Sequence, residues 1–197
     1  MPLSKRTTDL YPASLFELSE HEFPWWVAHV RSRQEKALAR HLLPLEIPFY
    51  LPQREKRVRR AGRTFVSYLP LFPGYLFFRG SFDHRHSALR SNLIVKVLYV
   101  IEPGLLAGEL LQVRRLQEAG ADLVPYFDLV PGDPVRITDG PFKGYSGVVL
   151  RAPGRVRLLV SISMLRQAVA VEFERAVVAP VRPVSADSTR NRSAAVS

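Results

Sequence analysis

The sequence predicts an α+β protein with two small domains joined by a linker. Over residues 24–120, short apolar runs typical of strands alternate with two or three helical patterns, which indicates an α/β sandwich. Over residues 131–181, five short β-branched runs are separated by turn residues, which indicates a small five-stranded β-barrel. Neither pattern covers residues 121–130, so we interpret that stretch as a linker.

The two ends of the chain lack both patterns. Residues 1–23 are polar and contain no continuous apolar stretch, so we expect a flexible leader rather than a secretory signal. Residues 182–197 are poor in apolar side chains and rich in Ser and Arg, so we expect a disordered tail.

The composition limits the classes of protein and site. The 197 residues are 47% hydrophobic, which is enough for packed cores. No apolar run reaches the roughly 18 residues of a membrane span, so we expect no membrane partner. There is no cysteine, which excludes disulfides and thiolate metal sites, and we expect a monomer in a reducing cytoplasm. The formal net charge of +10 favours a polyanionic partner, although a basic protein without one stays an alternative.

Each element of the first domain has its own local signal. Residues 25–30, WWVAHV, fit a buried strand. Ser32 and Glu35 have the spacing of a capping box, so we predict Ser32 as the N-cap of a helix that ends before Pro44. The other predicted elements are strands at 49–51, 75–78 and 94–101 and helices at 82–91 and 105–119.

Two alternating segments around Ala61 and Gly62 predict a hairpin with basic arms. The hairpin has one acid, Glu55, and six basic residues, which are Arg54, Lys56, Arg57, Arg59, Arg60 and Arg63. Charges on an edge strand can serve only to prevent edge-to-edge pairing. Six basic side chains exceed what that protection needs, so we predict that the hairpin binds nucleic acid through phosphates.

The second domain has a strand-like sequence throughout. The predicted strands are at 135–137, 147–150, 156–162, 169–173 and 176–178. Glycines and prolines between these runs would interrupt helices, at roughly 1 kcal/mol per glycine and 3 per proline. We therefore predict that residues 131–181 form strands, and not a pair of packed helices, when the protein is free of any partner.

The sequence gives no sign of catalysis. It has no phosphate-loop pattern and no G-x-S-x-G elbow, and its acids are scattered, so we predict no catalytic residue and no cofactor. His84 and His86 form an H-x-H pair. No nearby Cys or Glu completes a metal site and Arg85 would repel a cation, so we predict no metal.

Aromatic residues cluster in two strands and the turn between them. They are Trp25, Trp26, Phe72, Tyr75, Phe77 and Phe78. A packed core explains part of this set, Phe77 or Phe78 in particular. Because side chains alternate along a strand, we predict that the others form an exposed aromatic patch that binds a protein.

The order of these features resembles the NusG family. The resemblance rests on the strand Trp25-Trp26-Val27, the basic hairpin, the turn at 71–75 and the stretch DGPFKGYSGVV at 139–149. It covers roughly residues 25–181. It implies an NGN domain, which is an α/β sandwich with an antiparallel sheet, followed by a KOW β-barrel. Residues 60–77 look more like the specialised paralogues of the RfaH kind, although Gly74 is as in general NusG.

The resemblance also implies a mechanism. In this family the NGN domain docks on the clamp helices of the largest RNA polymerase subunit, bridges the DNA cleft and suppresses pausing or termination. A second contact, to the opposite side of the cleft, involves the start of the helix after residues 75–78, by position His86 and Ser87, for which a plain helix face is the alternative. The basic hairpin would lie near upstream or non-template DNA. The residues to which the resemblance assigns polymerase binding are Trp25, Trp26, Phe72, Pro73, Gly74, Tyr75, His86 and Ser87.

The KOW domain of this family recruits a further partner. The resemblance implies a small-subunit ribosomal protein or a termination factor, and the expected contact residues are Phe142, Tyr145, Ile162 and Met164. An alternative is a KOW-containing ribosomal or RNA-binding protein whose hairpin grips RNA. The sequence leaves open whether the factor promotes or suppresses pausing, and which genes it serves.

Overall fold

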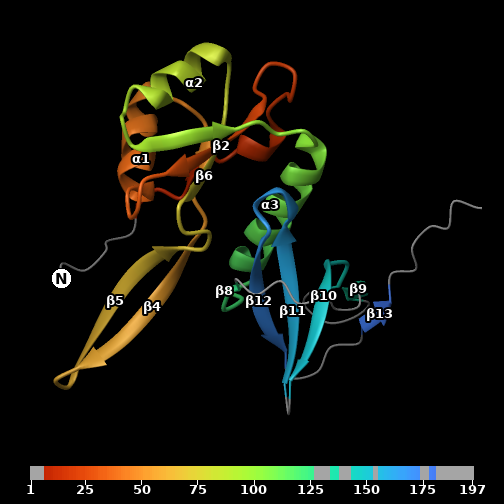
Figure 1. The fold of residues 1–197 in the computed structure, drawn as a ribbon. Coiled ribbons are helices and arrows are strands. Elements are labelled where there is room, and N and C mark those ends of the chain that lie inside the picture. The colour runs from red at the N-terminus through yellow and green to blue at the C-terminus, as the bar shows by residue number, and fades with distance from the viewer. Residues whose placement is uncertain (1–6, 127–133, 138–142, 153–154, 174–177, 181–197) are drawn as a thin grey trace, which may run out of the picture.

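The first domain is built on a five-stranded antiparallel sheet in the order β1-β3-β6-β2-β7 (Figure 1). The computed structural model describes residues 7–126, 134–137, 143–152, 155–173 and 178–180. The strands of this sheet are β1 (Leu10–Tyr11), β2 (Trp25–Val30), β3 (Phe49–Tyr50), β6 (Tyr75–Arg79) and β7 (Ile94–Leu98).

Both faces of this sheet are covered. Helices α1 (Glu35–Leu42) and α2 (Phe82–Leu89) pack on one face, and α3 (Pro103–Glu118) packs on the other. Side-chain alternation divides β2 between the two layers: Trp26 joins the cluster with α1 and α2, and Trp25 joins the cluster with α3. This arrangement agrees with the predicted α/β sandwich. No helix in the described part of the chain is long and apolar enough to span a membrane.

The predicted hairpin is a separate two-stranded ribbon. Its arms are β4 (Gln53–Arg60) and β5 (Arg63–Pro70), paired from Gln53 opposite Pro70 to Arg60 opposite Arg63. Ala61 and Gly62 make the turn with φ of 46° and 74°, and glycine suits the second position because it has no Cβ. The ribbon projects away from the sheet and its helices (Figure 1).

The prediction of a flexible leader does not hold for residues 7–23. Strand β1 pairs with β3, and Leu15 in the short helix η1 (Leu15–Glu17) is fully buried. Arg79, which is 1% exposed, donates hydrogen bonds to the carbonyls of Leu15 at 2.9 Å and Phe23 at 2.8 Å. Its guanidinium lies 5.0 Å from the ring centre of Trp25. A buried cation needs such acceptors, so Arg79 fastens the leader to the sheet.

The predicted capping box of α1 is wrong. The N-cap is Gln34, without a side-chain hydrogen bond, and Glu35 is the first helical residue. Arg33 has a φ of 61°, so the chain makes a left-handed turn between Ser32 and the helix, and Ser32 does not cap it. The Glu35 carboxylate bonds instead to Gly74.

The C-terminal region is a six-stranded antiparallel sheet in the order β13-β9-β10-β11-β12-β8. Its strands are β8 (Val124–Tyr126), β9 (Pro134–Ile137), β10 (Ser146–Ala152), β11 (Arg155–Ile162), β12 (Gln167–Phe173) and β13 (Val178–Pro180). Four of these, β9 to β12, agree with the predicted strands, and β13 overlaps the predicted strand at 176–178 only at Val178. The sixth, β8, lies in the stretch expected as a linker and pairs with β12. A closed barrel stays a prediction, because the described pairings end at β8 and β13.

The C-terminal sheet packs against α3 (Figure 1). Buried side chains of β11 and β12 share one cluster with the inward face of the helix, whose members are Leu106, Leu110, Val113 and Leu116. Such spacing places these four on one side of a helix. Helix α3 therefore buries apolar surface against both the first sheet and the C-terminal sheet.

Candidate functional site

The Pro73–Gly74 turn is held by hydrogen bonds from two directions. The Gly74 N–H donates to the Glu35 carboxylate at 2.7 Å, and the Gly74 carbonyl accepts from the Val30 N–H at 2.7 Å. Gly74 has a φ of 84°, a conformation that favours glycine. Glu35 is 6% exposed, so its carboxylate is a buried acceptor placed at the start of α1. The turn is thereby fixed to both β2 and α1.

This turn presents Pro73 and part of Tyr75. Pro73 is exposed, and Tyr75 is half-buried against the cluster that contains α3. The Tyr75 ring stacks on His29, with ring centres 5.2 Å apart and planes at 28°. Because His29 lies opposite Tyr75 in the sheet, the two rings support each other from neighbouring strands. Sequence analysis did not assign His29 or Glu35 to this site, since both contacts join segments far apart in the chain.

The predicted exposed aromatic patch is wrong for most of its members. Trp25, Trp26 and Phe72 are 2%, 6% and 1% exposed. The Trp26 indole donates to the Gly80 carbonyl at 2.7 Å, and Phe72 packs edge-on against Phe77, with ring centres 5.8 Å apart. The prediction assumed that one sheet face is open to solvent. Because both faces are covered, alternation sends the two tryptophans into two cores.

His86 and Ser87 do not join the turn. Helix α2 begins at Phe82, capped by Ser81 and by His84, whose Nδ1 accepts from the Ser81 N–H at 3.2 Å. His86 and Ser87 therefore lie in the middle of the helix rather than at its start. Helix α2 packs on the sheet face opposite to α3, whereas Tyr75 packs toward α3. The structure therefore separates the predicted second contact from the turn.

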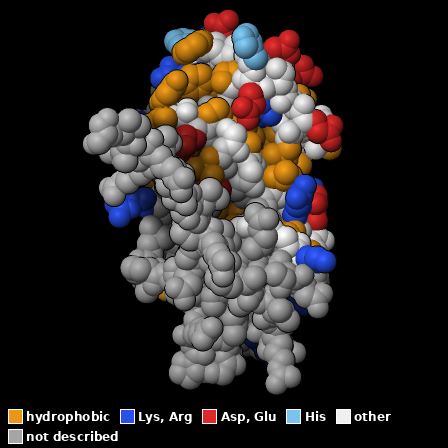
Figure 2. Space-filling view, turned by 90° about the vertical axis from the view of Figure 1, so that its right-hand side faces the viewer, with side chains coloured by type: hydrophobic (Ala, Val, Ile, Leu, Met, Phe, Trp, Pro, Cys, Tyr) orange, Lys and Arg blue, Asp and Glu red, His pale blue; other side chains and the backbone are white. Residues whose placement is uncertain are grey.

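Several large apolar side chains that the sequence analysis did not single out are exposed. Phe82, Tyr99 and Ile101 are 73%, 77% and 85% exposed. Residues 94–101 were predicted as one strand, but β7 ends at Leu98, so the last part of that apolar run lies beyond the sheet. Figure 2 shows one face on which hydrophobic side chains reach the surface beside Asp, Glu and His side chains.

The hairpin carries its cations at the surface. Lys56, Arg57, Arg59 and Arg63 are exposed. Arg57 is hydrogen-bonded to Glu55, and this bond is the main cause that lowers the pKa of the Glu55 carboxyl. Arg54 is half-buried, and the side chain of Arg60 lies outside the described residues. The predicted nucleic-acid residues thus lie on one ribbon, with Arg57 alone among the described ones bound to an acid of that ribbon.

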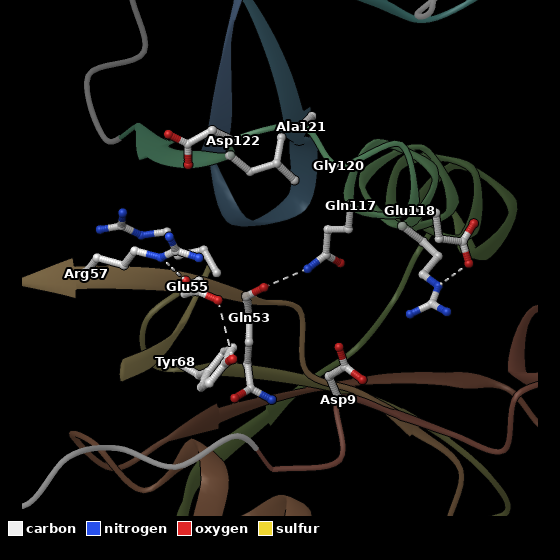
Figure 3. Close-up of a pocket in the computed structure, with 13 residues that line it drawn as sticks. Asp9, Gln53, Glu55, Arg57, Tyr68, Gln117, Glu118, Gly120, Ala121 and Asp122 are labelled. Atoms are coloured by element: carbon white, nitrogen blue, oxygen red, sulfur yellow. Dashed lines mark hydrogen bonds and ion pairs between the residues drawn. The ribbon is translucent and has the colours of Figure 1, made fainter. Parts of the chain in front are cut away.

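The root of the hairpin is bonded to two helices. Lys36 of α1 donates to the Tyr68 carbonyl at 2.6 Å, and Gln117 of α3 donates to the Gln53 carbonyl at 2.7 Å. Burial lowers the pKa of Lys36, and the nearby Arg40 charge lowers it further. Between the ribbon, the end of α3 and residues 120–123 is a cavity of about 780 Å³ (Figure 3). Arginines and acids in its lining bond to each other, as in Arg114 and Glu118.

The residues expected to bind a partner of the C-terminal domain face α3. Ile162 is fully buried, and Tyr145 and Met164 are half-buried against the cluster that contains α3. Burial raises the pKa of the Tyr145 phenol. The fourth predicted residue, Phe142, lies outside the described residues. The three described residues that were expected to contact a partner therefore contact the first domain instead.

Comparison with known proteins gives a family for the first domain. Residues 23–103 match the family model of NusG, described as transcription termination factor nusG. No curated protein matches the chain. Among solved structures, the MjSpt4:Spt5 complex in conformation A matches at 12% identity, with a TM-score of 0.27, over 80% of this chain and 99% of that chain. Conformation B matches at 12% identity, with a TM-score of 0.26, over 81% and 99%. These TM-scores are too low to carry an argument.

Proposed function

Because residues 23–103 match the NusG family model, we propose that the chain is a transcription elongation or antitermination factor that binds RNA polymerase and catalyses no reaction itself. The observation that carries this proposal is the extent of the match. It includes both the Pro73–Gly74 turn and the basic hairpin, the two features to which the sequence assigned binding.

The first domain docks on the clamp helices of the polymerase through the surface around the turn. Pro73 is exposed and Tyr75 is half-buried, so these two can contact a partner without unfolding the domain. Trp25 and Phe72 are buried in the cluster against which Tyr75 packs, whereas Trp26 is buried on the other face of the sheet. Docking bridges the DNA cleft and favours the closed clamp, which suppresses pausing or termination. A few kcal/mol of differential affinity is enough to hold one of two clamp states.

The hairpin contacts upstream or non-template DNA. This assignment is supported by the exposed side chains of Lys56, Arg59 and Arg63, because an exposed cation can reach a phosphate and neutralise its charge. Such binding is largely independent of sequence. The C-terminal sheet recruits a ribosomal protein or a termination factor. A partner that used Ile162 or Tyr145 would have to compete with α3 for them.

Capture of polymerase tests the proposal. Tagged wild-type chain should retain RNA polymerase from a bacterial lysate, and Tyr75→Ala should retain about tenfold less, as expected when a central aromatic anchor is removed. Tyr126→Ala is the matched control, because it removes another half-buried tyrosine from outside residues 23–103. Equal capture by wild type and Tyr75→Ala would refute docking through this turn. Ribosomal RNA without polymerase would support the RNA-binding alternative.

A further inference from the structure

The two arms of the hairpin are each bonded to a different helix. On β5, the Tyr68 carbonyl accepts from Lys36 of α1 at 2.6 Å. On β4, the Gln53 carbonyl accepts from Gln117 of α3 at 2.7 Å. Figure 3 shows Gln117 reaching from the end of α3 to the root of the ribbon. Since α1 and α3 cover opposite faces of the first sheet, the root is fixed to both layers of the domain.

The amide of Gln117 is itself held in one orientation. Its Oε1 accepts a hydrogen bond from the Tyr50 hydroxyl at 2.6 Å, while its Nε2 donates to Gln53. Rotating the amide by half a turn would set its oxygen against the Gln53 carbonyl, where no hydrogen lies between them. Tyr50 is fully buried, so the orientation is anchored in the core of the domain. Gln117 thus connects the core to the first residue of the ribbon.

Beyond the root, the ribbon is bonded mainly to itself. Ser67 Oγ donates to the Lys56 carbonyl at 3.3 Å, and the Tyr68 hydroxyl donates to Glu55 at 3.4 Å, so both bonds join one arm to the other. An arm of eight residues is about 26 Å long. A rotation of about 10° at the root would move the tip by about 4–5 Å, which exceeds the length of a charge-assisted hydrogen bond. Small changes at the root therefore decide where the cations lie.

We propose that Lys36 and Gln117 are positioning residues, which fix the direction of the hairpin so that its cations meet nucleic acid held on the polymerase. This inference rests on the proposed function of the hairpin. Neither side chain touches the nucleic acid. Their effect appears only when the nucleic acid is held in place by the polymerase. A free oligonucleotide can move to the hairpin whatever the direction in which the hairpin points.

The test compares two targets with the same variants. Lys36→Met and Gln117→Leu remove the hydrogen bond and keep most of the apolar part of the side chain. Their affinity for a free 20-nucleotide DNA strand should stay within about twofold of wild type. Their affinity for an elongation complex of RNA polymerase, DNA and RNA should fall about tenfold. The control Lys143→Met, which removes an exposed lysine elsewhere, should change neither affinity.

A distance measurement reports on the ribbon without any ligand. The chain has no cysteine, so cysteines introduced at Thr64 and Arg40, both exposed, can carry spin labels. Wild type should give a narrow distance distribution, and each positioning variant a broader or displaced one. Unchanged distributions, or unchanged affinity for the elongation complex, would overturn the inference.

A charge-reversal variant separates this failure from failure of the proposed function. Replacing Lys56, Arg59 and Arg63 by Glu should weaken binding to both targets. If it weakens neither, the hairpin does not bind nucleic acid and the proposed function of the hairpin fails, and with it the inference. If it weakens both while the positioning variants bind as wild type, only the inference fails.

Discussion

Gln112 and Ser146 exchange two hydrogen bonds across the junction between α3 and the C-terminal sheet. The Gln112 Nε2 donates to the Ser146 carbonyl at 2.6 Å, and the Ser146 N–H donates to Gln112 Oε1 at 3.1 Å. One turn earlier in α3, the Glu109 carboxylate accepts from the Ser163 N–H, at 3.0 and 3.1 Å to its two oxygens. These polar contacts flank the apolar cluster shared by the two regions. They define one docked position of the C-terminal sheet.

Replacing Gln112 should loosen this junction. Gln112→Ala removes both hydrogen bonds to Ser146, each worth about 0.5–1.5 kcal/mol net, so the undocked population should rise about 5- to 150-fold. Amide hydrogen exchange at Ser146 measures this population. The control is Arg115→Ala on the exposed side of the same helix. Equal protection of Ser146 in wild type and Gln112→Ala would show that the apolar cluster alone holds the sheet.

Docking of the C-terminal sheet should weaken as pH rises. Burial raises the pKa of Glu109 above its ordinary 4.5, against the opposing effect of its hydrogen bonds from Ser163. A carboxyl with a raised pKa in the docked state binds its proton more tightly there, so its contribution is fully present below the ordinary pKa. That contribution is lost as pH rises through the raised pKa.

Energy transfer between dyes on cysteines introduced at Arg40 and Lys143 measures the docked fraction over this range. Glu109→Gln should abolish the pH dependence, because the amide keeps an acceptor for Ser163 and does not titrate. Glu118→Gln, on an exposed carboxylate of the same helix, should leave the pH dependence unchanged. A wild-type docked fraction that rises with pH would contradict this assignment.

Loss of the Glu35 carboxylate should destabilise the Pro73–Gly74 turn. Glu35→Ala leaves the Gly74 N–H without its acceptor, and a hydrogen bond to a charged group contributes about 1.5–3 kcal/mol. Glu35→Gln offers a neutral acceptor and should lose less. Urea unfolding and exchange of the Gly74 amide measure the effect, with Glu20→Ala as the control on an exposed acid. The expectation fails if Glu35→Ala unfolds at the same urea concentration as wild type.

Binding of the hairpin to DNA should depend on salt in proportion to its free cations. Replacing Lys56, Arg59 and Arg63 by Gln removes up to three phosphate contacts. The slope of log affinity against log salt concentration should then fall by about 2–3, at 0.7–0.9 per contact. Replacing Lys143 by Gln should leave the slope unchanged. An unaltered slope in the triple variant would mean that the hairpin cations only protect an edge strand.

Local patterns in the sequence determined most of the elements. The strand at Trp25–Val30, the hairpin around Gly62 and the helical repeat from Leu106 to Leu116 agree with the structure. Each of these signals arises within a few residues, from side-chain alternation, from turn-forming residues or from a period of 3.6. Strands β9 to β12 of the C-terminal region agree for the same reason, because glycine, proline and β-branched residues disfavour helix locally.

The tertiary structure decided which of these residues are accessible. Alternation in β2 says that Trp25 and Trp26 point to opposite sides, but only the packing of helices on both sides buries them. In the same way, the sequence pattern of Ile162 and Tyr145 does not reveal that α3 faces them. The bond from Glu35 to Gly74 spans 39 residues, and the bond from Gln117 to Gln53 spans 64. Such contacts depend on how distant segments of the chain pack together, and local sequence periodicity does not predict that packing.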